Sequence, residues 1–267
     1  MKILIYKKEK MFFYIIIAIM VLIIAIFIVR RYHTNVCCVA ELTENSIISE
    51  ETFNKISTIT KNKEKVAYLT FDDGPSINVT PKILDILKEE DKKATFFVIG
   101  KKVEENQSIV KRAYEEGHYI ANHGYDHDNF KLYKSKESFK NEVTKTDEAI
   151  SKAINVQNYC SHLFRFPNGF MSPQKKRKKT AAVQTLTEMN YTYIDWNCLN
   201  NDSIKKISDF QLINNLKKSS KNKGTLVVLM HDTKDVNDTS RVLKESIEYI
   251  RSQGYEFKNF YSLIENE

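Results

Sequence analysis

The sequence predicts an α/β fold, a barrel-like sheet of about seven parallel strands preceded by an N-terminal transmembrane helix. Short apolar runs alternate with amphipathic stretches of helical length, which is the pattern of parallel strands joined by crossover helices. Polar residues that are unusual in such runs recur at the carboxyl ends of the predicted strands, where α/β folds place functional groups. A single long apolar segment near the N-terminus predicts the membrane helix.

This N-terminal segment has the length and composition of a membrane span. Residues 11–29 form an uninterrupted run of 19 apolar residues, close to the ~20 that a helix needs to cross a bilayer. More basic residues precede the run than follow it, which favours a cytoplasmic N-terminus over residues 1–10. We therefore expect an uncleaved signal anchor in the cell membrane, single-pass, with the rest of the chain extracellular. A cleaved signal peptide remains the alternative, although no small-residue cleavage site follows the run.

The distribution of charge argues against a nucleic-acid partner. The net charge is +7, and +5 of it lies in residues 1–31, around the apolar segment. The remainder is nearly neutral, so the basic balance reflects membrane topology. Residues 30–63 are polar and aperiodic, which predicts an extracellular linker to a domain over residues 64–267.

Strands and helices alternate through this domain. The predicted strands cover residues 66–72, 94–100, 119–123, 163–167, 192–197, 225–231 and 255–260. The predicted helices cover residues 81–90, 136–153, 174–189, 209–219 and 239–253. The first helix has a favourable start, because Thr80 suits the N-cap and Pro81 the first helical position.

The first predicted strand ends in two adjacent carboxylates, Asp72 and Asp73. Holding them together without a nearby cation is costly unless a metal or a proton separates their roles. Further along, His123 and His127 have the spacing that lets two imidazoles bind one metal from a helical turn. One carboxylate and two imidazoles leave open coordination positions, as in a catalytic metal site. We interpret Asp73 and the histidines as ligands and Asp72 as a base.

Polar or bulky residues also mark the other predicted strand ends. These candidates are Arg165, Asp195, Trp196 and His231, with Leu229 two residues before the last. We expect Arg165 to orient Asp72, and His231 to donate a proton to a leaving amine. Asp195 would fix the tautomer of His231 and raise its pKa. Leu229 and Trp196 would wall a small apolar pocket, and the whole set suits hydrolysis of an amide or ester.

These motifs resemble those of the polysaccharide deacetylases, the NodB-homology domain of carbohydrate esterase family four. The five segments that match, in the family's order, are residues 70–76, 122–127, 165–169, 195–196 and 229–232. The resemblance covers about residues 64–262 and implies a distorted barrel. It also implies a divalent metal and removal of acetyl groups from N-acetylated amino sugars. Zinc suits a ligand set of two imidazoles and a carboxylate, and cobalt, nickel or iron would also fit.

The resemblance also implies residue roles. It makes Asp72 the base, Arg165 its orienting residue and His231 the acid tuned by Asp195. The implied metal ligands are Asp73, His123 and His127. We expect Pro167, Asn168, Trp196 and Leu229 to contact the substrate.

Two positions depart from the family's pattern. Gly124 stands where the family often has Ser or Thr, whose hydroxyl would help to shape the metal loop. Asn168 stands after the proline of the third motif, so an aromatic platform for sugar is missing there. A backbone N–H at Asn168 still allows the oxyanion role.

An anchored, outward-facing deacetylase suits cell-wall peptidoglycan, with N-acetylglucosamine as the expected sugar. Chitin-like or poly-N-acetylglucosamine polymers are alternatives. A non-catalytic carbohydrate-binding relic of the fold, or amide hydrolysis on a non-sugar substrate, also stays open. The basic run over residues 174–179 opposes the macrodipole of its predicted helix, and contact with an anionic wall polymer would give that run a use.

Overall fold

A computed structural model describes Met20 and residues 48–173, 175–204, 207–233 and 238–264. The predicted cytoplasmic N-terminus, the membrane segment over residues 11–29 and the first half of the predicted linker lie outside them, Met20 excepted. Among the helices so described, none is both long enough and apolar enough to cross a bilayer. The chain from Leu42 to Glu267 forms one compact unit.

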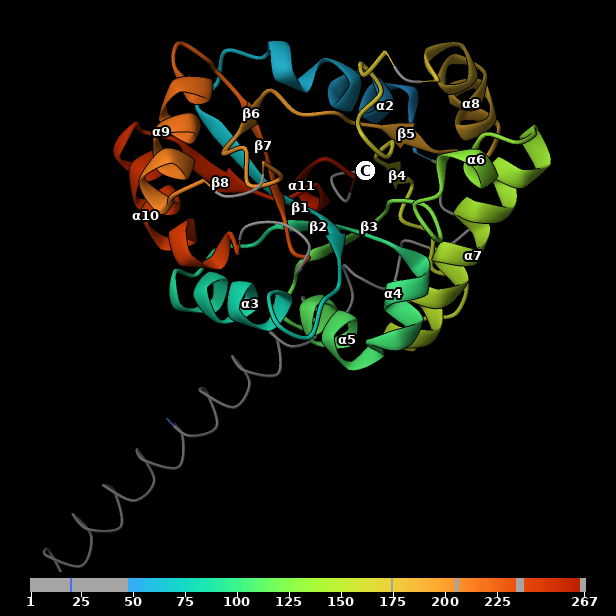
Figure 1. The fold of residues 1–267 in the computed structure, drawn as a ribbon, viewed down its shortest axis with the longest axis horizontal. Coiled ribbons are helices and arrows are strands. Elements are labelled where there is room, and N and C mark those ends of the chain that lie inside the picture. Colours follow the sequence, from blue (N-terminus) through green and yellow to red (C-terminus); the bar gives the residue numbers. More distant parts are fainter. Residues whose placement is uncertain (1–19, 21–47, 174, 205–206, 234–237, 265–267) are drawn as a thin grey trace, which may run out of the picture. The chain divides into compact units, whose positions relative to one another are not determined.

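One parallel sheet of eight strands forms the centre of this unit. The strands are β1 (Val66–Gly74), β2 (Thr95–Val98), β3 (Tyr119–Asn122), β4 (Leu163–Phe164), β5 (Thr192–Tyr193), β6 (Cys198–Leu199), β7 (Leu226–His231) and β8 (Glu256–Lys258). Seven follow the order β5-β4-β3-β2-β1-β7-β6, and β8 pairs with the start of β1. Among the described strands no ladder joins β5 to β6, so the sheet is a curled, open half-barrel (Figure 1).

Strand β1 has more neighbouring strands than any other strand that the structure describes. It pairs with β2, β7 and β8, and all but one of its residues are buried. Its continuous apolar run is what a strand covered on both faces requires. Because every strand is parallel to β1, all carboxyl ends lie at one edge, and the polar residues predicted at the strand ends are gathered there.

Helices surround the sheet (Figure 1). They are α2 (Glu50–Thr58), α3 (Thr80–Glu89), α4 (Gly100–Glu105), α5 (Gln107–Glu115), α6 (Asn129–Leu132), α7 (Lys136–Ile154), α8 (Lys176–Glu188), α9 (Asp209–Ser220), α10 (Ser240–Ser252) and α11 (Tyr261–Ile264), with a 3-10 turn over Ile59–Lys61. Local signals explain several boundaries. Ser135 caps α7, Asn155 ends it in the left-handed conformation, and Ser208 with Gln211 forms a capping box on α9.

All five predicted helices are present, and each end lies within two residues of its predicted position. Helix α3 begins at Thr80, one residue before the predicted start, because the Thr80 hydroxyl bonds Asp232 instead of capping the helix. Helices α2, α4, α5, α6 and α11 were not predicted.

The predicted linker over residues 30–63 is wrong in its second half. Helix α2 buries Thr52 and Ile56, and the Thr52 hydroxyl donates to the Leu263 carbonyl at 3.2 Å. The helix contacts β5, so it covers the open edge of the half-barrel. Two buried positions four residues apart are too short a pattern to predict a helix within a polar stretch.

The predicted strand over residues 192–197 is instead two short strands with a crossing between them. β5 pairs with β4, whereas β6 pairs with β7 at the other end of the sheet. The Asn197 side chain makes this crossing possible, because it accepts from the Val227 N–H at 2.9 Å and donates to the Thr225 carbonyl at 2.8 Å. The chain thus changes edges within a few residues, and this changes which polar residue reaches His231.

Candidate functional site

Two carboxylates at the end of β1 face the same histidine because the strand is bulged. The register with β2 shifts between Asp72 and Gly74, and Asp73 has a positive φ of 71°. In a regular strand, consecutive side chains point to opposite faces. Here Asp73 Oδ1 lies 3.3 Å and Asp72 Oδ2 4.0 Å from His123 Nε2. The bulge therefore turns an adjacent pair in sequence into a pair at one site.

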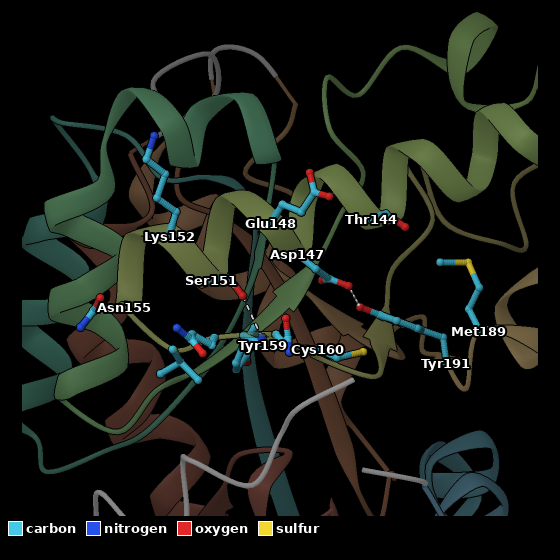
Figure 2. A pocket seen from close by; sticks show the side chains of 13 residues that line it. Thr144, Asp147, Glu148, Ser151, Lys152, Asn155, Tyr159, Cys160, Met189 and Tyr191 are labelled. Atoms are coloured by element: carbon cyan, nitrogen blue, oxygen red, sulfur yellow. Dashed lines mark hydrogen bonds between the residues drawn. The ribbon is translucent and has the colours of Figure 1, made fainter. Parts of the chain in front are cut away.

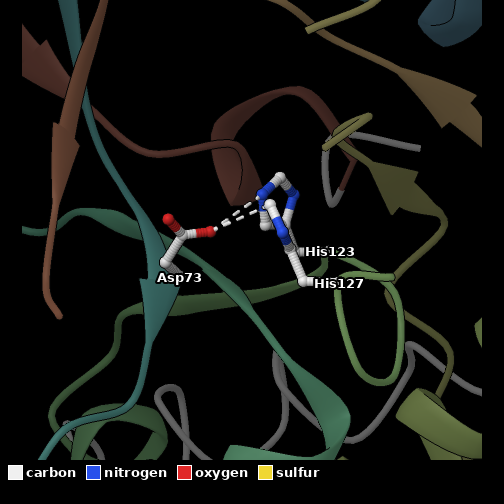
Figure 3. A group of neighbouring side chains, drawn as sticks. All are labelled: Asp73, His123 and His127. Carbon is white, nitrogen blue, oxygen red and sulfur yellow. Dashed lines mark ion pairs between the residues drawn. The ribbon is translucent and has the colours of Figure 1, made fainter. Parts of the chain in front are cut away.

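Asp73, His123 and His127 form a cluster whose ligand atoms all lie within 4.8 Å of one another. Figure 3 shows both imidazoles directed at the Asp73 carboxylate, with His127 Nε2 3.4 Å from Oδ1. Buried Asp73 Oδ1 accepts no hydrogen bond from the described residues. An unsatisfied carboxylate oxygen between two imidazole nitrogens is the arrangement that a divalent cation would satisfy. The residues therefore fit the metal that the sequence motifs imply.

The pKa shifts of Asp73 and His127 favour the same interpretation, whereas the charges of Asp72 and Asp73 raise the pKa of His123 against the effect of its burial. Burial alone raises the pKa of Asp73, but the close approach and charge of His123, together with His127 and His231, hold that pKa well below its ordinary value. Burial and the charge of His123 lower the pKa of His127. Asp73 is therefore a carboxylate and His127 a neutral imidazole at neutral pH, which are the forms that bind metals.

The two histidines are held in place by backbone and side-chain partners. His123 Nδ1 lies 2.7 Å from the Arg165 carbonyl, which fixes Nδ1 as the donor and leaves Nε2 for a ligand. Asn122 accepts from the Gly124 N–H at 2.9 Å. Glu142 of α7 accepts from the next two amides of the loop, at 2.9 and 3.3 Å. Three successive amides between the histidines are thus fixed from outside the loop.

The backbone conformation at Gly124 explains why glycine replaces the family's usual Ser or Thr at this position. Its φ is +83°, a left-handed conformation that favours glycine over residues with a side chain. The loop is ordered by Asn122 and Glu142, so no hydroxyl at position 124 is needed for that purpose. Asp126, between the histidines, pairs with Lys131 and lies outside the metal cluster.

Asp72 is paired with a fully buried arginine. Arg165 Nη1 lies 2.7 Å from Asp72 Oδ1 and 2.7 Å from the Thr70 hydroxyl. Its Nε donates to the Ile194 carbonyl at 3.1 Å, and the guanidinium stacks 3.9 Å from the Phe97 ring centroid. This network holds Asp72 Oδ1 and leaves Oδ2 on the side of the metal cluster. The predicted orienting role of Arg165 has the required geometry.

The predicted partner of His231 is wrong. His231 Nδ1 lies 2.7 Å from Asp202 Oδ1, and the His231 N–H donates to Asp202 Oδ2 at 2.8 Å. Asp195 instead accepts from the Phe170 and Met171 amides at 2.9 and 3.0 Å, bracing the β4–α8 loop. Asp202 follows β6, the neighbour of β7, whereas Asp195 precedes the crossing. The available signal was the short apolar pair at 198–199 before an aspartate.

Asp202 changes the acidity of His231. Burial alone lowers the pKa of this imidazole, but the hydrogen bond and charge of Asp202, with Asp72 and Asp73, raise it to about 9. His231 is therefore protonated at neutral pH. Because Nδ1 is occupied by Asp202, Nε2 is the nitrogen that can give a proton to another molecule.

The predicted substrate contacts occupy different positions around these groups. Pro167 is buried, whereas Asn168 is exposed with φ +62°. Trp196 is half-buried, packs closely over Gly169 and lies 5.8 Å from the Arg165 guanidinium. Leu229 is buried in β7, two residues before His231 and hence on the same face of the strand. The structure brings Trp196 close to the Asp72–Arg165 pair.

A separate pocket of about 630 Å³ lies away from this site, between α7 and the segments that precede β4 and β5 (Figure 2). None of the predicted site residues lines it. The Asp147 side chain in this pocket accepts hydrogen bonds from the Tyr191 hydroxyl and, at 3.0 Å, from the side-chain NH2 group of Asn122. The pocket thus contributes support to the metal loop and none of the candidate chemistry.

Comparison with known proteins agrees with the motifs. A family model described as polysaccharide deacetylase matches residues 60–194. A peptidoglycan-N-acetylglucosamine deacetylase of Bacillus cereus is 36% identical over 143 residues, which are 54% of this chain and 50% of that protein. The chain thus matches half the length of this relative.

Solved structures share the fold. A CE4 esterase of Streptococcus mutans superposes with a TM-score of 0.69 and 30% identity, covering 81% of this chain and 93% of that one. A CE4 family pseudoenzyme of Bacillus anthracis superposes with a TM-score of 0.62 and 28% identity, over 75% of this chain and 66% of that one. The predicted family is confirmed: the chain belongs to the polysaccharide deacetylases.

Proposed function

We propose that this protein is a metal-dependent hydrolase that removes N-acetyl groups from the amino sugars of an extracellular polysaccharide, with peptidoglycan N-acetylglucosamine as the substrate. One observation carries the proposal. The Asp73–His123–His127 cluster, the Asp72–Arg165 pair and the His231–Asp202 pair converge at the carboxyl edge of one sheet. Asp72 and His231 are direct partners in the β1–β7 register. A ligand set, a base and an acid thus share one site.

The three cluster residues would hold the divalent cation. Two imidazoles and one carboxylate suit zinc, with cobalt, nickel or iron as alternatives. When bound, the cation would lower the pKa of water and polarise the acetyl carbonyl.

The remaining residues would move protons and stabilise charge. Asp72, fixed by Arg165, accepts the proton of the attacking water through Oδ2. The Asn168 N–H donates to the oxyanion that develops on the acetyl oxygen. His231 then gives its Nε2 proton to the leaving nitrogen, while Asp202 stabilises the charged imidazole. The amide C–N bond breaks, and acetate and a free amine leave.

A carbohydrate-binding relic of the same fold is the second candidate, and the similarity to a pseudoenzyme supports weighing it. A relic is expected to lose a ligand or the acid. Here the ligand cluster, the arginine-paired Asp72 and the carboxylate-paired His231 are all present with favourable geometry. These residues favour the active enzyme.

Peptidoglycan is proposed as the substrate because the Bacillus cereus relative carries that activity in its name and because an anchored, outward-facing enzyme meets the wall first. The anchor over residues 11–29 and the extracellular position of the domain are part of the same proposal.

Acetate release tests the proposed function. We would assay the chain from Leu42 to Glu267 on N-acetylated peptidoglycan and on a chitin oligomer, with chelator and with zinc restored. Asp72→Asn and His231→Ala should each lose about 10²–10⁴-fold in kcat, the range for a general base or acid. Asp85→Asn, an exposed carboxylate paired with Arg112, is the matched control.

Three other outcomes would each point elsewhere. Release that survives chelation would overturn the metal assignment. Bound metal without release from either polymer would indicate another acyl substrate. Neither metal nor release would favour the relic.

A further inference from the structure

The large apolar side chains that are most exposed among the described residues of this domain follow the carboxyl ends of strands, on the side of the metal cluster. The large apolar residues that are more than half exposed among the described residues from 48 onward are Ile77, Phe130, Met171, Ile204 and Phe210. Each follows the carboxyl end of a strand, in the segments after β1, β3, β4 and β6. Single exposed apolar residues are ordinary, but their confinement to one edge marks a contact surface.

Phe130 is the member closest to the chemistry in sequence. It lies three residues after His127, in the short helix α6, and is 79% exposed. Asp128 caps this helix by accepting from the Phe130 N–H at 2.8 Å. The segment that carries a metal ligand therefore also presents an aromatic ring to solvent.

The start of α8 packs against this segment and adds positive charge. Lys175 Nζ lies 4.7 Å from the Phe130 ring centroid, and Lys178 Nζ donates to the Tyr133 carbonyl at 3.0 Å. Lys179 is buried and donates to the Gly169 carbonyl, beneath the loop that packs on Trp196. The last two lysines of the basic run are thus structural, and they fix α8 beside the site.

The first three cations of the run differ from the last two because they are exposed and have no carboxylate partner among the described residues. Lys175, Lys176 and Arg177 are exposed, and none forms an ion pair with a carboxylate of the described residues. By contrast, Lys131 and Lys136 nearby are paired with Asp126 and Glu188. Three cations in the first turn of a helix oppose its macrodipole, at a cost of about 0.3–1 kcal/mol each. No carboxylate of the described residues compensates for that cost, and Lys175 has only the Phe130 ring beside it there.

We infer that Phe130 with Lys175, Lys176 and Arg177 forms a binding surface for the carboxylate-bearing glycan strand on either side of the reacting sugar. This inference rests on the proposed function. The Phe130 ring would stack on the apolar face of a neighbouring sugar, and the three cations would pair with carboxylates on the same strand. The surface would therefore favour peptidoglycan, which carries carboxylates on its peptides and on those lactyl groups that bear no peptide, over neutral chitin-like polymers.

Steady-state kinetics on peptidoglycan and on a neutral chitin oligomer test the inference. In the Leu42–Glu267 chain loaded with zinc, the triple variant Lys175→Gln/Lys176→Gln/Arg177→Gln should raise KM on peptidoglycan about tenfold at low salt, as expected for three exposed ion pairs. The difference should shrink near 0.5 M salt. Its kcat on peptidoglycan, and both parameters on a chitin oligomer, should stay within about twofold. Phe130→Ala should raise KM on both substrates.

A charge-matched control separates this surface from net charge. Lys61, Lys63 and Lys221 are exposed and precede β1 and β7, at the opposite edge of the sheet. Their triple replacement by Gln removes the same charge and should leave KM on peptidoglycan unchanged. Equal losses in both triple variants, or an unchanged KM in the Lys175 variant, would overturn the inference.

Binding assays keep the inference testable if the enzyme proves inactive. Retention on insoluble peptidoglycan should fall in the Lys175 triple variant, whether or not acetate is released. Removing phosphate polymers with hydrogen fluoride should preserve retention, whereas blocking the free carboxylates of the polymer by carbodiimide coupling to glycinamide should reduce it. Loss of binding to phosphatidylglycerol vesicles with unchanged retention on peptidoglycan would instead assign the surface to the membrane.

Discussion

His231 is hydrogen-bonded to Asp202 through both its ring and its backbone, with Nδ1 2.7 Å from Oδ1 and the main-chain N–H 2.8 Å from Oδ2. The double contact fixes the position, tautomer and acidity of the imidazole at once. Asp202 is 2% exposed and His231 13% exposed, so the pair is screened only weakly by solvent. Asp202 is thus the residue that prepares His231 to act as an acid.

Asp202→Asn should shift the alkaline limb of the kcat/KM profile to lower pH. The pKa of His231 is raised to about 9, so the acid form persists through neutral pH and is lost as pH rises through that value. Removing the Asp202 charge lowers this pKa, and activity then declines earlier on the alkaline side. A bound cation adds positive charge nearby and lowers the limb in both proteins, so the difference between them is the measured quantity. Asp195→Asn is the control, and an equal shift there would contradict the assignment.

Glu142→Ala should weaken metal binding. Glu142 accepts from the Tyr125 and Asp126 amides, in the loop between the two histidine ligands. Residues that orient metal ligands typically contribute 10–100-fold to affinity, so we expect about a tenfold rise in the zinc dissociation constant. Competition with a chromogenic chelator measures it. Glu148→Ala removes an exposed carboxylate from the same helix and should have no effect.

Arg165→Met should destabilise the fold as well as inactivate the enzyme. Arg165 is fully buried against Asp72, and removing one partner of a buried pair leaves a charge without compensation, at a cost of about 3–5 kcal/mol. Urea unfolding of the chelated protein measures the loss. Arg241→Met breaks an exposed pair with Asp209 and should change the free energy of unfolding by less than about 1 kcal/mol. Equal losses in the free energy of unfolding would show that the buried Arg165–Asp72 pair stabilises the fold no more than an exposed pair does.

Gly74→Ala should disrupt the end of β1. A Cβ at Gly74 would overlap Asp232 Oδ2, and Asp232 is buried with that oxygen bonded to the Thr80 hydroxyl at 2.7 Å. The clash should lower the melting temperature and displace Asp73. Adding Asp232→Ala removes the obstructing carboxylate, so the double variant should melt higher than Gly74→Ala alone. Calorimetry of both variants decides, and no recovery would place the strain elsewhere.

The sequence by itself determined the parts of the site that depend on short spacing. Asp72 and Asp73 end an apolar run, and His123 and His127 are four residues apart, so local patterns were sufficient to pair a candidate base with candidate ligands. Arg165 and His231 were found because parallel strands bring their carboxyl ends to one edge. The family followed from the order of these motifs, and the comparisons confirm it.

Only the tertiary structure decided which acid partners His231. Asp195 and Asp202 are seven residues apart, and each follows a strand of only two residues, too short to show a period. Asp202 reaches His231 and Asp195 does not, because the chain crosses from the β4 side of the sheet to the β7 side between them. The same holds for Glu142 and for the separation of structural from unpaired cations in the 174–179 run. These properties depend on contacts between segments distant in sequence, which a local pattern does not encode.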